Sequence, residues 1–225
     1  MSEDLQQSEA STNDEILSPT EIRVLAVLAE KEALTPDNYP LSLNALTNGC
    51  NQLTSRDPVM SLTEDEVQQC LKRLMQKKLV AEVSQSGARV IKYEHRMRIK
   101  WLLEQDKLAV LTSLMLRGPQ TAGEIRNRTG RMFEFAAVGD VEAGLQFLMD
   151  KYPPVVARLA RLPGSKEARY AHLLGGEVNI DTLPAAAHAG SHSRPSASLE
   201  AEVAELRAQV EKLTEQFEEF KKQFD

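Results

Sequence analysis

The sequence contains two copies of one arrangement, and this internal repeat limits the possible folds more than any other feature. Three blocks recur in the same order: an apolar helix, an amphipathic helix and a pair of strands around a turn. The matched pairs are residues 23–30 (RVLAVLAE) with 107–114 (KLAVLTSL), 66–77 (EVQQCLKRLMQK) with 140–151 (DVEAGLQFLMDK), Gly87 with Gly164 and Tyr93 with Tyr170. Because the order is kept while the spacing changes, we expect two related units that differ by loop insertions. A single α+β domain with a coincidental internal similarity is the alternative.

Each copy is predicted to contain three helices followed by a hairpin. Ser18 and Thr63 each precede a helical apolar periodicity and have a Glu three residues later, which is the capping-box pattern, and Thr121 is a further N-cap. Alternating apolar residues around Gly-containing turns predict the hairpins. The remaining expected elements are helices at 41–50, 107–117 and 140–151 and hairpins at 79–95 and 155–174. Three helices and a two-stranded wing form the winged-helix pattern, and we expect the apolar stripes to build two compact bodies.

Composition excludes several classes of protein. The chain has 225 residues, 42% of them hydrophobic, which is enough for real cores. It has no run of about 18 apolar residues, and its acidic N-terminus does not resemble a signal peptide. We therefore expect a cytoplasmic protein without membrane contact. Cys50 and Cys70 form no metal-ligand pattern and are expected to be buried thiols, so neither a metal nor another cofactor is expected.

The predicted fold class is mainly α with small β-hairpins (α+β), as tandem winged-helix domains followed by a coiled-coil helix. The expected segments are a disordered acidic tail at 1–17, winged-helix domain 1 at 18–100, winged-helix domain 2 at 101–178, a flexible linker at 179–198 and a coiled coil at 199–225. The net charge is -6, but residues 18–175 carry 22 Lys and Arg against 18 Asp and Glu. This excess is too small to identify a nucleic-acid-binding protein by itself.

The C-terminal segment has an apolar residue at every third or fourth position. The residues of this seam are Leu199, Val203, Leu206, Val210, Leu213, Phe217, Phe220 and Phe224. Valine at a and leucine at d favour a parallel dimer, in which Glu202 of one chain would face Arg207 of the other. We expect a homodimer; a helix lying on its own body and a coil with another protein are the alternatives.

The third helix of a winged-helix unit usually enters the major groove of DNA. Here both third helices begin with acidic residues, which repel phosphate, although Gln68, Gln69, Lys72 and Arg73 could serve if the first of them docks by its middle. Basic residues gather elsewhere, near the end of the first hairpin and on the second helix of copy two. The tentative nucleic-acid-binding residues are Arg56, Arg89, Lys92, Arg96, Arg98, Lys100, Arg126 and Arg128. The hairpin charges could grip a DNA backbone or simply protect an exposed strand edge.

The loop between the second and third helices of copy one is unusually polar. Its candidate recognition residues are Asn51, Gln52, Ser55, Arg56 and Asp57. Such side chains could bind a base, a peptide or a small ligand, but they also satisfy backbone groups in turns. Both interpretations stay open at this point.

The stretch LSPTEIRVLAVLAEKEALTPDNYPLSLNALTNGCNQLTSRDPVMSLTEDEV, together with RGPQTAGEIRNRTGRM and ARYAHLL, resembles the bacterial YceH-type family of uncharacterised proteins. The resemblance covers residues 18–175 and is most distinctive in the loop CNQxxSRDPV. It implies a tandem winged-helix fold and carries no activity or site residues with it.

The sequence contains no nucleophile elbow, phosphate-binding loop, dinucleotide-binding motif or zinc-protease motif, so we do not expect an enzyme. The first hypothesis is a dimeric DNA-binding protein, possibly regulatory in role, in which Arg56 and the hairpin of copy one contact phosphates. The rival hypothesis is a protein-interaction adaptor whose winged helices contact other proteins.

Overall fold

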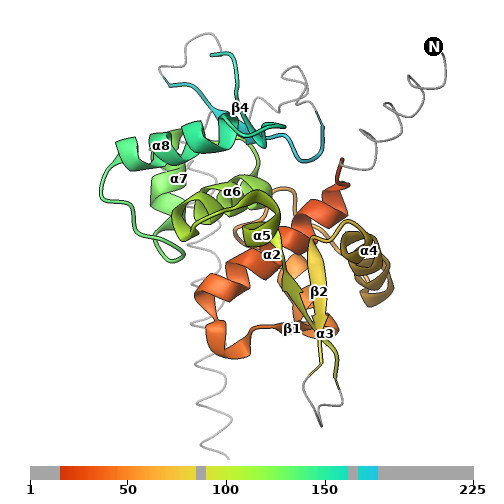
Figure 1. Cartoon of the computed structure of the whole chain (residues 1–225). Helices are drawn as coiled ribbons and strands as arrows, with labels where there is room; N and C mark the ends of the chain where they lie inside the picture. The colour runs from red at the N-terminus through yellow and green to blue at the C-terminus, as the bar shows by residue number, and fades with distance from the viewer. Residues whose placement is uncertain (1–15, 85–89, 162–166, 177–225) are drawn as a thin grey trace, which may run out of the picture. The chain divides into compact units, whose positions relative to one another are not determined.

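The first repeat is built around one long helix with a sheet and two further helices packed against it (Figure 1). The computed structural model describes residues 16–84, 90–161 and 167–176. The elements of the first repeat are α2 (Pro19–Leu34), the 3-10 helix η1 (Pro36–Asn38), β1 (Leu41–Ser42), α3 (Leu43–Cys50), α4 (Glu64–Gln76), β2 (Val80–Val83) and β3 (Lys92–His95). The strands form an antiparallel sheet in the order β1-β3-β2, with Leu41 opposite Tyr93 and Val80 opposite His95.

The second repeat has the same order of elements after a short connecting helix, α5 (Met97–Trp101). Its elements are α6 (Gln105–Arg117), α7 (Ala122–Thr129), α8 (Val138–Met149), β4 (Val156–Arg158) and β5 (Tyr170–His172). β4 and β5 pair antiparallel, and Gln120 forms an isolated bridge to Tyr170 where β1 pairs with β3 in the first repeat. The described residues therefore form a mixed α/β structure of seven α-helices with short antiparallel strands.

Side-chain caps fix where the helices begin. Ser18 accepts a hydrogen bond from the Glu21 amide while the Glu21 carboxylate accepts one from the Ser18 amide, and Thr63 caps α4 in the same reciprocal way. Thr121 also forms a complete capping box, at the start of α7. These three predicted caps are confirmed. Three expected helix starts shift: Leu41–Ser42 is a strand and not part of a helix, and α6 and α8 begin at Gln105 and Val138, each two residues before the expected start.

The second strand of the first hairpin, β3, ends at His95, where the hairpin was expected to end. The basic residues beyond it were not expected to be helical, but Met97–Trp101 forms the short helix α5. Met97 of this helix is fully buried. Arg98 and Lys100 therefore lie on a helix between the repeats and do not continue the alternation of the strand.

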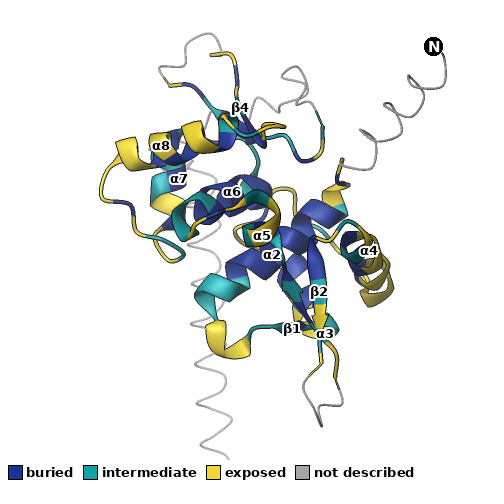
Figure 2. Cartoon of the chain, viewed as in Figure 1, coloured by how far each residue is buried: buried dark blue, intermediate teal, exposed yellow. Residues whose placement is uncertain are grey.

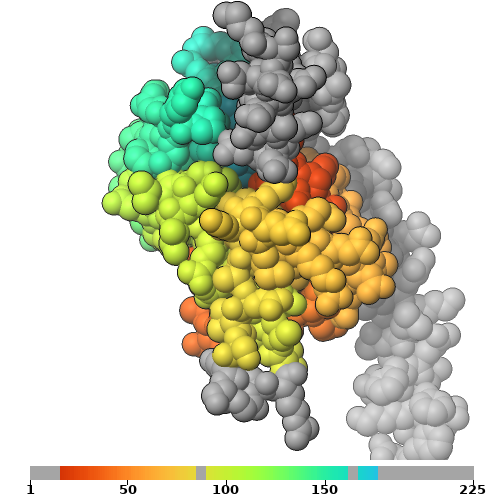
Figure 3. All heavy atoms as spheres, turned by 45° about the vertical axis from the view of Figure 1, so that its right-hand side comes forward, coloured from red at the N-terminus to blue at the C-terminus, as the bar shows by residue number. Residues whose placement is uncertain are grey.

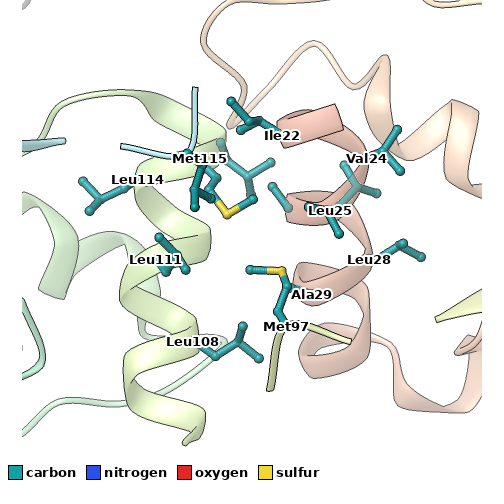
Figure 4. Packing of buried hydrophobic residues seen from close by; sticks show 14 of the residues in the cluster. Ile22, Val24, Leu25, Leu28, Ala29, Met97, Leu108, Leu111, Leu114 and Met115 are labelled. Carbon is teal, nitrogen blue, oxygen red and sulfur yellow. The ribbon is translucent and has the colours of Figure 1, made fainter. Parts of the chain in front are cut away.

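The two repeats share one hydrophobic core, so the expectation of two separate compact bodies is wrong. α2 and α6 pack side by side along their lengths, with Ile22 beside Met115 at one end and Ala29 near Leu108 at the other (Figure 4). Both helices are buried on nearly every side, at residues 21–30 and 108–116 (Figure 2). A helix that is apolar all round must be enclosed by other elements, and here each repeat encloses the central helix of the other.

Backbone hydrogen bonds also join the repeats. The amide of Leu17 donates to the carbonyl of Leu174 at 2.7 Å, and the amide of Asp57 donates to the carbonyl of Leu116 at 2.8 Å. The described residues all belong to one compact unit, Met1–Ile180. The expected linker at 179–198 and the coiled-coil seam at 199–225 lie outside the described residues, as do residues 1–15 of the expected tail. No helix among the described residues is long and apolar enough to cross a lipid bilayer.

Candidate nucleic-acid interface

The outer side of α4 is the most polar exposed helix face of the first repeat. Val67, Cys70, Leu71 and Leu74 point inward and are buried, which leaves the opposite side of the helix in solvent (Figure 2). The exposed side chains on that opposite side are Gln68, Gln69, Lys72, Arg73 and Gln76. α4 and the neighbouring β2 together form a continuous face in the space-filling view (Figure 3). This face combines amides, which can pair with base edges, and two cations, of which Lys72 can pair with phosphate while Arg73 also forms an ion pair with Glu21 at 3.4 Å.

Two of the three acidic residues in the first turn of α4 are held by local hydrogen bonds. The Glu66 carboxylate accepts from the Thr63 amide at 2.7 Å and from the Thr63 hydroxyl at 2.9 Å, and these bonds lower its pKa. The Glu64 carboxylate accepts from the Asn44 side-chain amide at 2.9 Å. The acidic turn therefore caps the helix and binds α3, while the cations lie further along the helix.

The corresponding helix of the second repeat, α8, has a different outer side. By the matching of 66–77 with 140–151, the counterparts of the α4 face are Glu142, Ala143, Gln146, Phe147 and Asp150. All five are exposed, and this side carries two acids and no base. The Phe147 ring is 39% exposed, with Lys107 Nζ 5.5 Å and Lys151 Nζ 4.4 Å from its centre. Polyanion binding by the helix face itself is thus favoured in the first repeat and disfavoured in the second.

The basic residues expected on the first hairpin are mostly engaged within the protein. Arg96 forms an ion pair with Glu94 at 2.9 Å. Arg98 forms one with Glu32 at 3.0 Å and also donates to Gln105. The side chains of two further residues remain available: Lys92 is partly exposed and Lys100 is exposed. Arg89 lies outside the described residues.

Arg98 belongs to a polar cluster that joins the repeats. The carboxylate of Glu32, at the end of α2, also lies 3.2 Å from His95 Nε2, and the His95 Nδ1 accepts from the Met97 amide. The His95 hydrogen bond and the Arg98 charge outweigh burial and lower the pKa of Glu32 to about 2. The bond from Arg98 to Gln105 connects α2, β3 and α5 to α6, and Gln105 donates in turn to the Met132 carbonyl in the turn after α7. Its role in the structure is therefore to brace the connection between the repeats.

Arg126 and Arg128 point to different places, as their two-residue spacing on a helix requires. Arg126 donates to the carbonyls of Phe135 and Ala136 and fixes the loop before α8. Arg128 is exposed and donates to the Gln120 side chain at 2.9 Å. The two do not form a joint patch.

Arg56 is an internal residue, which corrects the expectation that it contacts phosphate. Its side chain is 0% exposed and makes two hydrogen bonds to the Glu30 carboxylate, at 3.1 and 2.6 Å. It also donates to the carbonyls of Gly49 and Ser55 and to the side chain of Gln52. Burial opposes ionisation of Glu30, but the bonds and charge of Arg56 prevail and lower its pKa. Arg56 thus anchors the polar loop from inside.

The other polar residues of this loop serve mainly to shape it. Asn51 binds both backbone groups of Leu62, donating to the carbonyl at 2.8 Å and accepting from the amide at 2.7 Å. A second buried arginine, Arg23 of α2, donates to the carbonyls of Cys50 and Pro58. Ser55, at φ 63°, and Asp57 have exposed side chains. Asn51 and Arg56 therefore follow the second interpretation of the loop, in which polar side chains satisfy backbone groups instead of binding a ligand.

The cysteines and possible metal ligands were also expected to have no role at a functional site. Both cysteines are buried and free, and burial raises the pKa of each thiol to about 12. Among the described residues, no group of three or more His, Cys, Asp or Glu side chains could hold a metal ion. Four of the five residues of the α4 face were expected from the sequence, and Gln76 was missed. Its spacing of seven and eight residues from Gln69 and Gln68 places it on the same side of the helix.

The chain was compared with known protein families and sequences. A family model described as "Protein of unknown function, DUF480" matches residues 17–165. A UPF0502 protein of Herminiimonas arsenicoxydans is 74% identical over 170 residues, which cover 76% of this chain and 72% of the relative. A UPF0502 protein of a Janthinobacterium strain is 70% identical over 187 residues, covering 81% and 80%, and one of Koribacter versatilis is 48% identical over 196 residues, covering 84% and 90%. The chain therefore belongs to the DUF480 family of bacterial proteins, whose relatives carry the name UPF0502.

Proposed function

We propose that this protein binds double-stranded DNA through the outer face of α4, with the β2–β3 hairpin as the wing of a winged-helix unit. The second repeat would be a winged-helix unit of the same kind that does not use its α8 face for DNA. The proposal gives the protein a binding role in the cytoplasm and no catalytic reaction. It includes a homodimer formed through residues 199–225.

The observation that carries this proposal is the contrast between the two third helices. Where α4 exposes Lys72 and Arg73, α8 exposes Gln146 and Phe147. Buried positions of the two helices match, so the difference is confined to the side that faces solvent. Side-chain amides pair with adenine in the major groove, and lysine and arginine pair with phosphate or guanine. A face of this composition suits DNA better than it suits an apolar protein partner.

The arrangement of elements in the first repeat supports the same proposal. The first repeat runs helix, strand, helix, helix and two strands, and its sheet has the order β1-β3-β2. In a winged-helix unit, elements in this order present the third helix on one surface with the hairpin beside it. The carboxylates of Glu64 and Glu66 are bound to α3 and to the helix cap. The repulsion expected from the acidic first turn therefore acts at one end of the face, and we infer that DNA meets the middle and C-terminal half of α4.

The alternative function is that of a protein-interaction adaptor, and the outer side of α8 favours it for the second repeat. Exposed Phe147 and Ala143 offer apolar area between acidic residues, a composition more common in protein interfaces than in DNA interfaces. The two functions are compatible, since they use different helices.

The test is a titration of fluorescently labelled random duplex DNA with the full-length protein, read by anisotropy at several salt concentrations. The test variant is Lys72→Gln, since this exposed lysine makes no ion pair within the described part of the chain. Lys151→Gln, at the end of the second repeat's third helix, removes the same charge and is the control. Loss of one phosphate contact should make the slope of log Kobs against log salt less negative by about 0.9 in the Lys72 variant only. If the wild type does not bind at low salt, or both variants behave alike, the proposal is wrong.

A further inference from the structure

A second group of positive charges gathers where the two repeats meet, at the C-terminal end of α6. The amide of Asp57 donates to the Leu116 carbonyl, which brings Arg56 and Arg117, each adjacent to one of those residues, close to each other. Arg128 approaches the same place from α7 through its bond to Gln120, two residues beyond the C-cap of α6. The three arginines thus come from the loop, from α6 and from α7, and the charges of Arg56 and Arg128 both act on Arg117.

Two of these three arginines lack an acidic partner. In the described ranges, no ion pair involves Arg117 or Arg128, whereas Arg56 is bound by Glu30. Burial lowers the pKa of Arg117, and the positive charges of Arg128 and Arg56 lower it further. The charge of Glu30 acts in the opposite direction on the pKa of Arg117, but its effect is the smallest of these. A half-buried cation beside two other cations is stabilised when an anion neutralises it.

The orientation of Arg128 is fixed by a buried support. Gln120 is 0% exposed; its side-chain nitrogen donates to the carbonyls of Ser113 and Gly118, and its side-chain oxygen accepts from the Ser113 hydroxyl. That oxygen also accepts from Arg128 Nη1 at 2.9 Å. The guanidinium is thus held by a buried amide, and within the described part of the chain the Arg128 side chain makes no other hydrogen bond although it is exposed. A preorganised guanidinium fork of this kind suits the oxygens of a phosphate.

We propose that Arg117 and Arg128 form a phosphate-binding site at the junction of the repeats, separate from the α4 face. The ligand is a phosphate group, either of a small phosphorylated molecule or of a DNA backbone. The neutral Gln120 orients Arg128 without neutralising it, and the positive charge of Arg56 acts on Arg117 while the hydrogen bonds of Arg56 remain internal. Phosphate binding here does not require the α4 face to bind DNA.

The first measurement uses no DNA. The melting temperature of the full-length protein is followed in sodium phosphate and in sodium chloride of equal ionic strength. We expect phosphate to raise the melting temperature of the wild type, and this rise to disappear in Arg117→Ala/Arg128→Ala and to diminish in Arg128→Ala. Arg158→Ala, which removes an exposed arginine from β4, is the control and should keep the full rise. The single variant Arg128→Ala controls for misfolding, because Arg128 is exposed and its replacement removes no side chain from the core.

The second measurement identifies the source of the phosphate. If DNA supplies it, the double variant should bind random duplex DNA with a salt slope less negative by about 1.8, the value for two lost contacts. If a small molecule supplies it, the slope stays the same while the phosphate-dependent rise is lost. The proposal is overturned if the double variant matches the wild type in both measurements. A failure of Lys72→Gln to affect DNA binding would refute the α4 proposal and leave this one standing.

Discussion

Removing the buried guanidinium of Arg56 is predicted to destabilise the protein strongly. Arg56→Met leaves the Glu30 side chain, which is 10% exposed, without its main partner. It also removes the donors bound to the Gly49 and Ser55 carbonyls and to Gln52. Breaking a buried ion pair by deleting one partner costs about 3–5 kcal/mol in unfolding free energy. For a protein of this size, that loss corresponds to a decrease of roughly 6–20 °C in melting temperature.

The assay is urea unfolding at neutral pH, followed by circular dichroism, on a double-mutant cycle of Glu30 and Arg56. Replacing both residues with methionine removes the uncompensated charge, so Glu30→Met/Arg56→Met should recover much of the loss. An Arg56→Met deficit below about 1 kcal/mol, typical of a surface ion pair, would refute the assignment of Arg56 as an internal anchor.

The pH dependence gives this prediction an independent check. In the wild type the pKa of Glu30 is lowered, so the pair stabilises the fold above the carboxyl's ordinary pKa and loses this effect as the pH falls through the lowered value. In Arg56→Met the burial of Glu30 is no longer offset by the guanidinium, so protonation would relieve the buried charge. The deficit of the variant should therefore shrink as the pH falls below about 5. A deficit that is constant from neutral to acidic pH would contradict this.

Three further predictions test the core, the packing of α3 against α2 and the C-terminal seam. Leu111→Ala in the shared core should cost about 2–5 kcal/mol and leave a single unfolding transition by calorimetry, whereas two transitions would show that the repeats unfold separately. Gly49→Ala places a Cβ 2.6 Å from Val27 Cγ1 and should lower stability in chemical unfolding by about 1–3 kcal/mol, and an unchanged midpoint would refute the close approach. Deleting residues 199–225 should convert a dimer to a monomer in light scattering, and an unchanged oligomeric mass would exclude the coiled coil.

The local features of the fold could be predicted because they depend on residues close together in the sequence. Capping boxes need only a residue and its neighbour three positions on, and Ser18 and Thr63 have that pattern. The apolar periodicity of residues 67–75 gave the buried side of α4 for the same reason. The side that remains exposed followed directly, which is why most of the candidate site was visible in the sequence.

What could not be predicted depends on contacts between distant residues. Arg56 pairs with Glu30, 26 positions earlier, so its burial has no local signal and it resembled a surface cation. The shared core, in contrast, is indicated by the sequence of its two central helices. Residues 24–29 and 108–111 are apolar without interruption, which leaves no polar side over a full helical turn, and a helix of that kind is enclosed on both faces. Two separate three-helix bodies would have left one side of each helix exposed to water.

The most direct test of DNA binding by the α4 face is hydrogen–deuterium exchange of the full-length protein with and without duplex DNA. The account predicts slower exchange on adding DNA within residues 64–83, which include α4 and β2, and no change within α8. Slower exchange in α8 with none in α4 would contradict it and would assign the DNA contact to the second repeat.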